Sequence, residues 1–550
     1  MAVNARTEKL LERFATLRSQ RATWETHWQE IADYMIPRKN DVIYQSATAG
    51  EKKMDLIYDS TAIHALELLA SSLHGMLSSS ASPWFTLQYT EKYLNEDDLA
   101  AEWLENTTRV IYEMLSRSNF DQEMHELYYD LCAFGTACLL IEDDGVNGVR
   151  FSARHIAELY LAENSSGYVD VVYRKFKMTG RAMLERFGRD VIPGQLVRQI
   201  DKDPYLEHEI LHVVQPREDR DPTKIDALNK PYESIYIEQK HRKIIADEGF
   251  DSFPYCPVRM LKDSASVYGR SSAMVALPDV KMLQKMSETT IKAAQKQVDP
   301  PLLVPDDGFA MPVRTTPGGL NFYRPGTRDR IEPLSIGANA PVGIQMEEQR
   351  RNAIRQAFFV DQLIMPTGSN MTATETVART EQKLRLLGPV MGRVSQELLK
   401  PCLNRTFDIL LKQNRFGEIP DILDGVEFKI EYVSPLAKAQ RTGDLQSLMR
   451  GIEILGSLAQ VAPVFDYLDP DPLVKHLFEI LGIPAKITRS SEEVAEMRQI
   501  QAEQVAQQQE MQQAMEMAQA AGAAAPALKV VGEQYPATEE ETPEIVQPPV

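Results

Sequence analysis

Apolar residues follow a helical pattern in the N-terminal part of the chain. They recur at intervals of three, four or seven positions, as on one helix face, at Leu10, Phe14, Leu17, Trp24, Trp28, Ile31 and Met35. Pro37 ends this run, because proline lacks the backbone donor that a helix needs. Residues 60–80, 98–118 and 121–134 repeat the pattern. We therefore expect a helical first third, with a change from helix to strand at 133–144 (AFGTACLLIEDD).

From about residue 145 to 265 the pattern changes to that of β-strands. The segments are short, rich in β-branched and aromatic residues, and separated by polar turns. They read VRFSARHIAELYLAE, YVDVVYRKF, EILHVVQ, YESIYIEQ and FPYCPVRML. One helix, 179–188, interrupts them, with Thr179 as its N-cap and Gly188 beyond its end.

A third pattern begins in the middle of the chain. A helix is predicted over 277–298, with Pro278 in its first turn, and it stops at Asp299-Pro300-Pro301. Residues 299–341 are rich in proline and glycine and predict a looped, partly β insert, after which a helix returns over 342–362. A loop of small residues follows at 364–374. A long helix then covers 387–414, with kinks at Gly388-Pro389 and Pro401.

The C-terminal part is predicted to begin with a strand and to end without structure. The strand covers 426–432 (VEFKIEY), and short helices follow to about residue 483. Ser490 and Glu493 form a capping box for a helix over 491–520 that is rich in Gln, Ala and Met. The acidic, proline-rich tail from about 522 is expected to be disordered.

Composition narrows the class of protein. The chain has 550 residues, 43% of them hydrophobic and 25% charged, which is typical of a soluble globular protein. The formal net charge of -19 argues against general nucleic-acid binding, although an acidic wall would keep a passing duplex from sticking. The four cysteines form no C-x-x-C pair, and no secretory signal is present. The most apolar window, 65–82, is too polar for a membrane span. We expect an intracellular soluble protein.

One motif suggests enzymatic chemistry. Residues 208–212 read HEILH, the pattern in which two histidines bind zinc and a glutamate activates water. The peptidase reading requires a helix and a third ligand, but the segment lies between Pro204 and Pro216 and its valines favour a strand. On a strand, His208 and His212 would lie about 13 Å apart, too far to share a metal. We expect two ordinary histidines and no metal, although an apolar helix face through the same segment stays possible.

No nucleotide-binding P-loop and no G-x-S-x-G elbow occur in the sequence. The one organised basic feature is a row on one face of the 277–298 helix, formed by Lys281, Lys285, Lys292 and Lys296. It has two interpretations with similar weight. It is either a solvated face with ion pairs, for example to Glu347 and Glu348, or a row of ammonium groups that faces a polyanion.

The order of these segments resembles the portal (head-to-tail connector) protein of short-tailed bacteriophages. The resemblance covers roughly residues 5–485, and several separated stretches carry it. These are RFATLRSQRATWETHWQEIADYMIPR, STAIHALELLASSLHGML, SPWFTL, YGRSSAMVALPDVKMLQKM, DPPLLVPDDG, LGPVMGRVSQELLKP and YVSPLAKAQRTGD. The Gln-rich helix and the acidic tail lie outside its reliable part.

The resemblance implies an α+β, mainly helical portal fold that assembles as a ring. Its regions would be the wing (1–265), the first stem helix (266–298), the clip (299–341), the second stem helix (342–363), the tunnel loop (364–374), a long kinked wing helix with the following strand (375–443), the crown with the C-terminal helix (444–520) and a disordered tail (521–550). In this family the segment that holds HEILH is a wing strand.

The resemblance also implies a function without catalysis or cofactors. Twelve copies would form a channel for double-stranded DNA at one capsid vertex of the virion, after assembly in the host bacterial cytoplasm. The expected partners are the terminase large subunit, tail adaptor or nozzle proteins, and the major capsid and scaffolding proteins, with no membrane. A zinc peptidase that uses HEILH and another phage scaffold or morphogenesis protein are the alternatives, and the large β region argues against a scaffold.

Three groups of residues are the candidate functional positions. The tunnel loop contains Met365, Pro366, Thr367, Gly368, Ser369, Asn370, Met371 and Thr372. The clip contains Pro300, Pro301, Asp306, Asp307, Arg314, Arg324, Arg328 and Arg330. The lysine row is the third group, as a surface that would face the channel. Small, flexible residues in the tunnel loop suit a segment that shifts as DNA passes.

Overall fold

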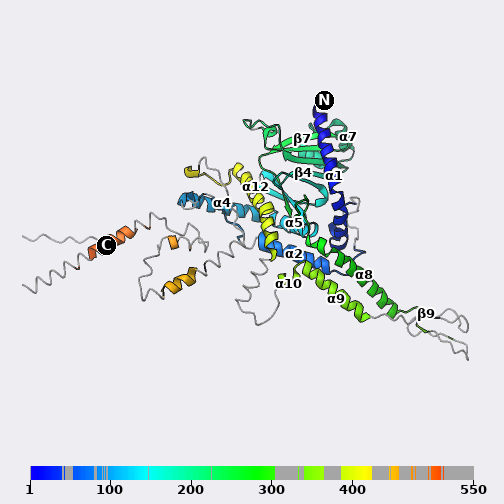
Figure 1. Cartoon of the computed structure of the whole chain (residues 1–550). Helices are drawn as coiled ribbons and strands as arrows, with labels where there is room; N and C mark the ends of the chain where they lie inside the picture. Colours follow the sequence, from blue (N-terminus) through cyan, green and yellow to red (C-terminus); the bar gives the residue numbers. More distant parts are fainter. Residues whose placement is uncertain are drawn as a thin grey trace, which may run out of the picture. The chain divides into compact units, whose positions relative to one another are not determined.

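The computed structural model divides the chain into two compact units, Met1–Asp469 and Pro470–Val550 (Figure 1). It describes residues 2–39, 42–43, 54–79, 83–89, 91, 93–94, 97–145, 148–224, 226–303, 322, 332–333, 340–364, 386–423, 445, 448–456, 472–474, 477, 494, 497–508 and 512. In the second unit the described residues are helical, and those at 494, 497–508 and 512 agree with the predicted helix over 491–520. No helix in the described part of the chain is both long and apolar enough to cross a membrane.

The N-terminal helices confirm the prediction from the apolar pattern. They are α1 (Ala2–Met35), α2 (Thr61–Leu77), α4 (Asp98–Arg117) and α5 (Phe120–Phe134), with a short 3-10 turn η1 (Pro37–Lys39) after α1. Gly135 ends α5 in the left-handed region with φ of 75°. A side chain there would collide with the backbone of Gly269 and Arg270, so this turn requires glycine.

Two antiparallel sheets follow. The first has the order β2-β1-β8, from β1 (Thr136–Gly145), β2 (Gly148–Arg154) and β8 (Tyr255–Arg259). The second has the order β3-β4-β5-β6-β7. Its strands are β3 (Leu159–Glu163), β4 (Val169–Thr179), β5 (Glu207–Pro216), β6 (Tyr232–Glu238) and β7 (Lys243–Phe250), with 3-10 turns η2 (Ile156–Glu158) and η3 (Ala227–Asn229).

Two elements of this region were missing from the prediction. Strand β7 lies at the edge of its sheet, and edge strands commonly carry charged residues. Its Lys243, Asp247 and Glu248 interrupt the apolar pattern by which a strand is recognised in the sequence. The predicted helix is present as α6 (Gly180–Phe187), and Thr179 caps it by accepting from the amide of Ala182. A second helix, α7 (Gly194–Lys202), follows it and buries only Leu196 and Ile200.

The helices of the middle region differ from the prediction at their ends. The first is α8 (Ser272–Val298), which begins five residues earlier than predicted. The Ser271 side chain accepts from the amide of Met274, so a polar cap and not Pro278 sets the start. The predicted single returning helix is wrong, because it is divided into α9 (Ala340–Ala357) and α10 (Val360–Leu363). Phe359 interrupts it with a left-handed backbone, φ 58°.

The remaining described segments belong to the predicted insert and the predicted long helix. In the insert, β9 (Leu302–Leu303) pairs with β10 (Glu332–Pro333), which confirms a β element there. The described part of the long helix runs from 386, widens into the π-helical turn η4 (Ser395–Leu399) and continues as α12 (Lys400–Lys412), before a 3-10 turn η5 (Asp421–Leu423). Pro401 lies in the first turn of α12, just after the π turn, where the backbone hydrogen bond that proline cannot donate is accommodated. The predicted strand over 426–432 lies outside the described residues.

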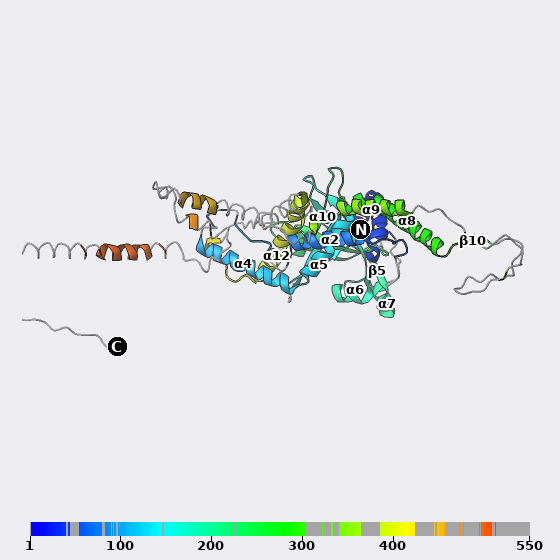
Figure 2. The same ribbon diagram turned by 90° about the horizontal axis from the view of Figure 1, so that it is seen from below.

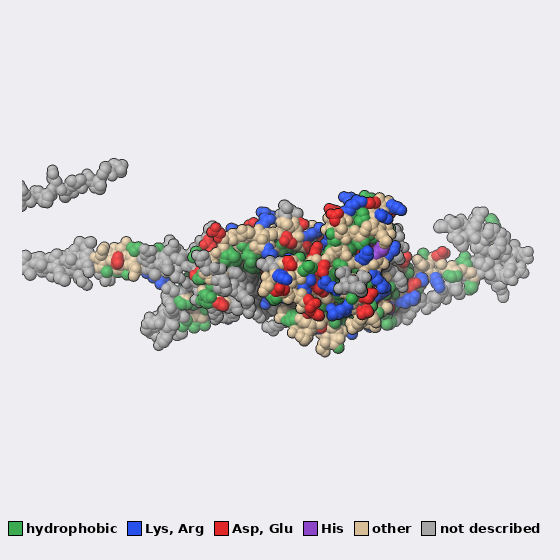
Figure 3. All heavy atoms as spheres, turned by 90° about the horizontal axis from the view of Figure 1, so that it is seen from above, with side chains coloured by type: hydrophobic (Ala, Val, Ile, Leu, Met, Phe, Trp, Pro, Cys, Tyr) green, Lys and Arg blue, Asp and Glu red, His purple; other side chains and the backbone are tan. Residues whose placement is uncertain are grey.

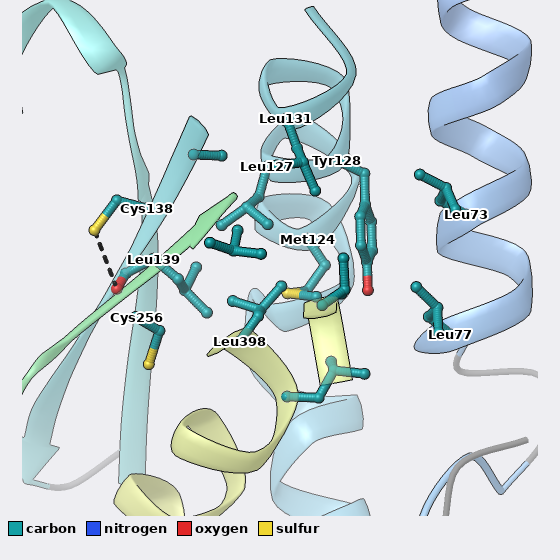
Figure 4. Close-up of a cluster of buried hydrophobic side chains, with 14 of the residues drawn as sticks. Leu73, Leu77, Met124, Leu127, Tyr128, Leu131, Cys138, Leu139, Cys256 and Leu398 are labelled. Carbon is teal, nitrogen blue, oxygen red and sulfur yellow. Dashed lines mark hydrogen bonds between the residues drawn. The ribbon is translucent and has the colours of Figure 1, made fainter. Parts of the chain in front are cut away.

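The core of the first unit surrounds α5. In Figure 4, side chains of α5 lie between α2 on one side and strand β1 and η4 on the other. The labelled apolar members are Leu73, Leu77, Met124, Leu127, Leu131, Leu139 and Leu398. These residues come from segments more than 300 positions apart, so burial of their apolar area joins the helices, the small sheet and the long helix into one unit.

A buried ion cluster crosses the same junction. The guanidinium of Arg259 on β8 donates to both oxygens of Glu397 in η4, at 2.7 and 3.1 Å, and also pairs with Glu163 on β3. The Arg259 side chain is 2% exposed and that of Glu397 is 8% exposed. An unpaired charge at this depth is costly, so each member depends on the others.

Replacement of Glu397 by glutamine is therefore expected to lower the free energy of unfolding by about 3 kcal/mol, because it leaves a buried guanidinium partly unpaired. Chemical denaturation of the purified chain measures this. The matched control is Asp201→Asn, which breaks the exposed pair with Arg189 and should cost less than about 1 kcal/mol. An equally small decrease in the free energy of unfolding in both variants would show that the ion cluster contributes little to stability.

Candidate functional site: HEILH and the paired helices α8 and α9

The HEILH segment lies on strand β5, as the strand interpretation predicted. His208 and His212 are both buried. Both ring nitrogens of His212 are engaged, Nδ1 with the hydroxyl of Tyr255 at 2.9 Å and Nε2 with that of Ser234 at 3.0 Å. Its ring also stacks on Tyr236, with centroids 4.0 Å apart. Within the described part of the chain, no group of three metal-ligating side chains is placed to hold an ion. This geometry is that of a structural histidine.

The surroundings of His212 keep it uncharged. Burial lowers the pKa of this imidazole well below its usual value, and the nearby guanidinium groups of Arg174, Arg186 and Arg154 lower it further. The folded chain therefore holds His212 neutral, whereas the unfolded chain protonates it below about pH 6.5. Stability from this site is fully present above that pH and declines as the pH falls.

As the pH falls from 6.5 to 5, protonation of His212 in the unfolded chain is expected to lower the free energy of unfolding by about 2 kcal/mol. Each pH unit contributes about 1.4 kcal/mol to this change. The change His212→Gln should flatten this pH dependence, whatever it does to stability at pH 7. Denaturation curves at several pH values measure the slope. His64→Gln serves as the control, because the His64 side chain is exposed. The same slope in wild type and His212→Gln would contradict the assignment.

Helices α8 and α9 lie side by side and run in opposite directions, as Figures 1 and 2 show. Two polar contacts join them. Asp279 pairs with Arg350 at 2.7 Å, and the hydroxyl of Thr290 donates to Glu347 at 2.6 Å. The partner numbers fall on α9 as they rise on α8, which is the signature of an antiparallel pair. These contacts fix the register of the two helices.

The segment before α2 anchors the pair to the rest of the unit. The amide oxygen of Gln284 accepts from the backbone amides of Tyr58 and Asp59, and its nitrogen donates to the carbonyl of Asp59. Arg351 donates to the Asp59 carboxylate at 2.9 Å. Burial would raise the pKa of Asp59, but hydrogen bonds from Thr61 and Arg351 outweigh it and lower the pKa. Sequence reasoning missed this anchor, because its partners lie more than 200 positions apart.

The predicted lysine row lies on an exposed face of α8, but most of it is paired within the subunit. Lys281 pairs with Glu30 at 3.0 Å, and Lys285 and Lys292 both pair with Glu288. Hydrogen bonds from these two lysines lower the pKa of Glu288 to about 2. For Lys296 the structure shows an exposed side chain with no ion pair to another described residue.

The expected pairing of the lysines with Glu347 and Glu348 is wrong. Those carboxylates bind Arg351 and Arg355 on their own helix. On the molecular face in Figure 3, acidic and basic side chains of the first unit are interspersed and form no broad basic patch. The row is thus a local feature of α8.

The other predicted functional positions are mostly outside the described residues. Pro300 and Pro301 follow α8 directly, as expected for the start of the clip segment. The remaining clip positions are not among the described residues, and neither is any tunnel-loop position from Met365 to Thr372. Their roles stay predictions.

Comparison with known proteins identifies the family. The model of the family described as "Bacteriophage head to tail connecting protein" matches residues 7–488, most of the chain. The chain belongs to this family. It is 32% identical over 514 residues to the "Probable portal protein" of Bordetella phage BPP-1, covering 92% of each chain. It is 30% identical to the portal protein of Salmonella phage epsilon15, covering 90% of this chain and 91% of that one, and 24% identical to that of Enterobacteria phage T3, covering 80% and 81%.

Family membership confirms the predicted α+β portal fold and the role of a phage portal protein, a component of the virion at the junction of head and tail. These matches name portal proteins and no catalytic family. The zinc-peptidase interpretation of HEILH is not supported, since the motif lies on a strand and both nitrogens of His212 are occupied.

Proposed function

We propose that copies of this chain form a ring of twelve at one capsid vertex, with a channel through which double-stranded DNA is packaged and later ejected. The ring docks the terminase large subunit through 299–341 and afterwards the tail adaptor or nozzle proteins, and it contacts the major capsid and scaffolding proteins. It assembles in the host bacterial cytoplasm and catalyses no reaction. The family match over residues 7–488 is the observation that carries this proposal.

Exposed apolar side chains support assembly with other copies. Val275 and Met282 lie two turns apart on one edge of α8 and are 66% and 51% exposed. This edge adjoins the lysine row. Large apolar side chains in a row on the exposed side of a helix favour burial against a partner. In a closed ring, the partner is the next copy of the same chain.

The double variant Val275→Glu, Met282→Glu is expected to remain folded and to lose the ring, because two carboxylates would lie in the contact between copies. Negative-stain images and mass measurement in solution give the result, with rings around a central hole for the wild type. Val191→Glu is the matched control, since Val191 is 54% exposed on the loop between α6 and α7. A wild-type chain without rings would refute the proposed function. Rings from the double variant would refute only this contact.

A channel that passes DNA of any sequence requires a wall with low affinity for the duplex. Phosphate contacts give affinity without sequence preference, so few of them are wanted in a channel. The net charge of -19 fits a bore that repels and centres the duplex. The lysine row of α8 would add weak cationic contacts, with Lys296 as the member that has no ion pair to a described residue. The tunnel loop over 364–374 would narrow the bore as a one-way check.

Deletion of residues 366–371 is therefore expected to leave rings and empty heads intact and to impair retention of packaged DNA. DNA content of purified heads, measured against ring formation by the same variant, tests this. Normally filled and stable heads would count against a role for the loop.

A further inference from the structure

A row of uncharged amides runs along the exposed side of α9. Its members are Gln345, Gln349, Asn352 and Gln356, at spacings of four, three and four, which place them on one helix face. All four side chains are exposed. The buried side of the same helix carries Glu347 and Ile354, so the amides lie on the side that faces away from the core.

The charges next to this row are neutralised within the subunit. Helix α9 has five charged residues, and each forms an ion pair. Arg350 pairs with Asp279, Arg351 with Asp59, Glu347 and Glu348, and Arg355 with Glu348. In a chain with a net charge of -19, this face therefore presents almost no free charge of either sign.

Most of the amides keep their hydrogen-bonding groups available. Asn352 accepts from Arg355 at 3.1 Å through its oxygen. The side chains of Gln345, Gln349 and Gln356 make no hydrogen bond to any other residue that the structure describes. An amide both donates and accepts, so such a row can satisfy phosphate oxygens, base edges or water equally well.

We propose that this amide row lines the DNA path beside the lysine row, as an uncharged strip of wall along which the duplex slides. The inference rests on the proposed portal function. Each neutral hydrogen bond to DNA contributes only about 1 kcal/mol and is exchanged with water, so no contact holds the duplex. Neutral groups also release no counterions, so the wall adds no salt-dependent affinity.

A contact between copies suits this face less well. Cores of protein interfaces favour apolar and aromatic side chains, and an ordered glutamine loses up to about 2 kcal/mol of conformational entropy. The exposed large apolar side chains that meet this requirement lie off the row, at Val275 and Met282 on α8 and at Ile344 and Met346 on α9. The apolar positions thus suit contact with a neighbouring copy, and the amide row suits contact with the duplex.

The test adds charge to the row. Full-length rings that carry Gln345→Lys and Gln349→Lys are compared with rings that carry Gln122→Lys and Gln195→Lys, two glutamines exposed on α5 and α7. Binding of a short fluorescent duplex is measured over a range of salt concentrations. We expect the α9 variant to bind about tenfold more tightly than the wild type at low salt, with a steeper loss of affinity as salt rises. The control variant should match the wild type.

Three results would overturn the proposal, and they differ from one another. Unchanged DNA affinity in intact α9-variant rings would place the row away from the duplex. Loss of rings in the α9 variant alone would make the row a contact between copies. Absence of rings in the wild type would refute the portal function itself, and this inference with it.

Cross-linking gives a second readout that needs no added charge. Rings with Gln349→Cys or Gln195→Cys are incubated with a duplex that carries an iodoacetyl group. The native thiols Cys132, Cys138, Cys256 and Cys402 are all buried, so the introduced cysteine is the reactive one. Cross-links at position 349 but not at 195 are expected, and equal labelling at both positions would contradict the proposal.

Discussion

The buried guanidinium of Arg259 holds together parts of the first unit that the chain order keeps apart. It joins β8 to the π-helical turn η4 and to β3, through Glu397 and Glu163. The same turn places Leu398 in the core around α5 and leads into Pro401. A carboxylate in place of an apolar residue costs desolvation, but it also allows only one register of the long helix against the small sheet. The positions of the other helices depend on that register.

Polar contacts have a similar role in the paired helices. The first half of α8 packs its apolar side against the core of the first unit, whereas most residues of the second half are exposed. In the second half, Thr290 donates a hydrogen bond to Glu347. Gln284 and Arg351 then anchor the pair to the segment around Asp59. The charged residues of α9 are paired within the chain, and its exposed side carries uncharged amides together with Ile344 and Met346. The charge of this surface thus follows from internal pairing, and the overall composition of the chain does not reveal it.

HEILH shows how environment decides the chemistry of a motif. In a zinc peptidase the two histidines project from one helix turn toward a metal. Here β5 lies between β4 and β6, and the sheet supplies Ser234 and Tyr236 while β8 supplies Tyr255. Burial keeps the imidazole of His212 neutral, and its neighbours use both nitrogens. The strand geometry of HEILH and the hydrogen bonds at both ring nitrogens of His212 exclude the enzymatic interpretation. They weigh more than the absence of a third metal ligand among the described residues.

By itself, the sequence determined the types and order of most elements and the family resemblance, because apolar periodicity and caps such as Thr179 act over a few residues. Local patterns did not reveal the charged edge strand β7 or the break at Phe359, since pairing with β6 and burial of Phe358 override local preference there. Only the tertiary structure decided which charges are free. Lys281 pairs with Glu30, Arg351 with Asp59 and Arg259 with Glu397, all far apart in the sequence, and folding alone brings these pairs within hydrogen-bonding distance.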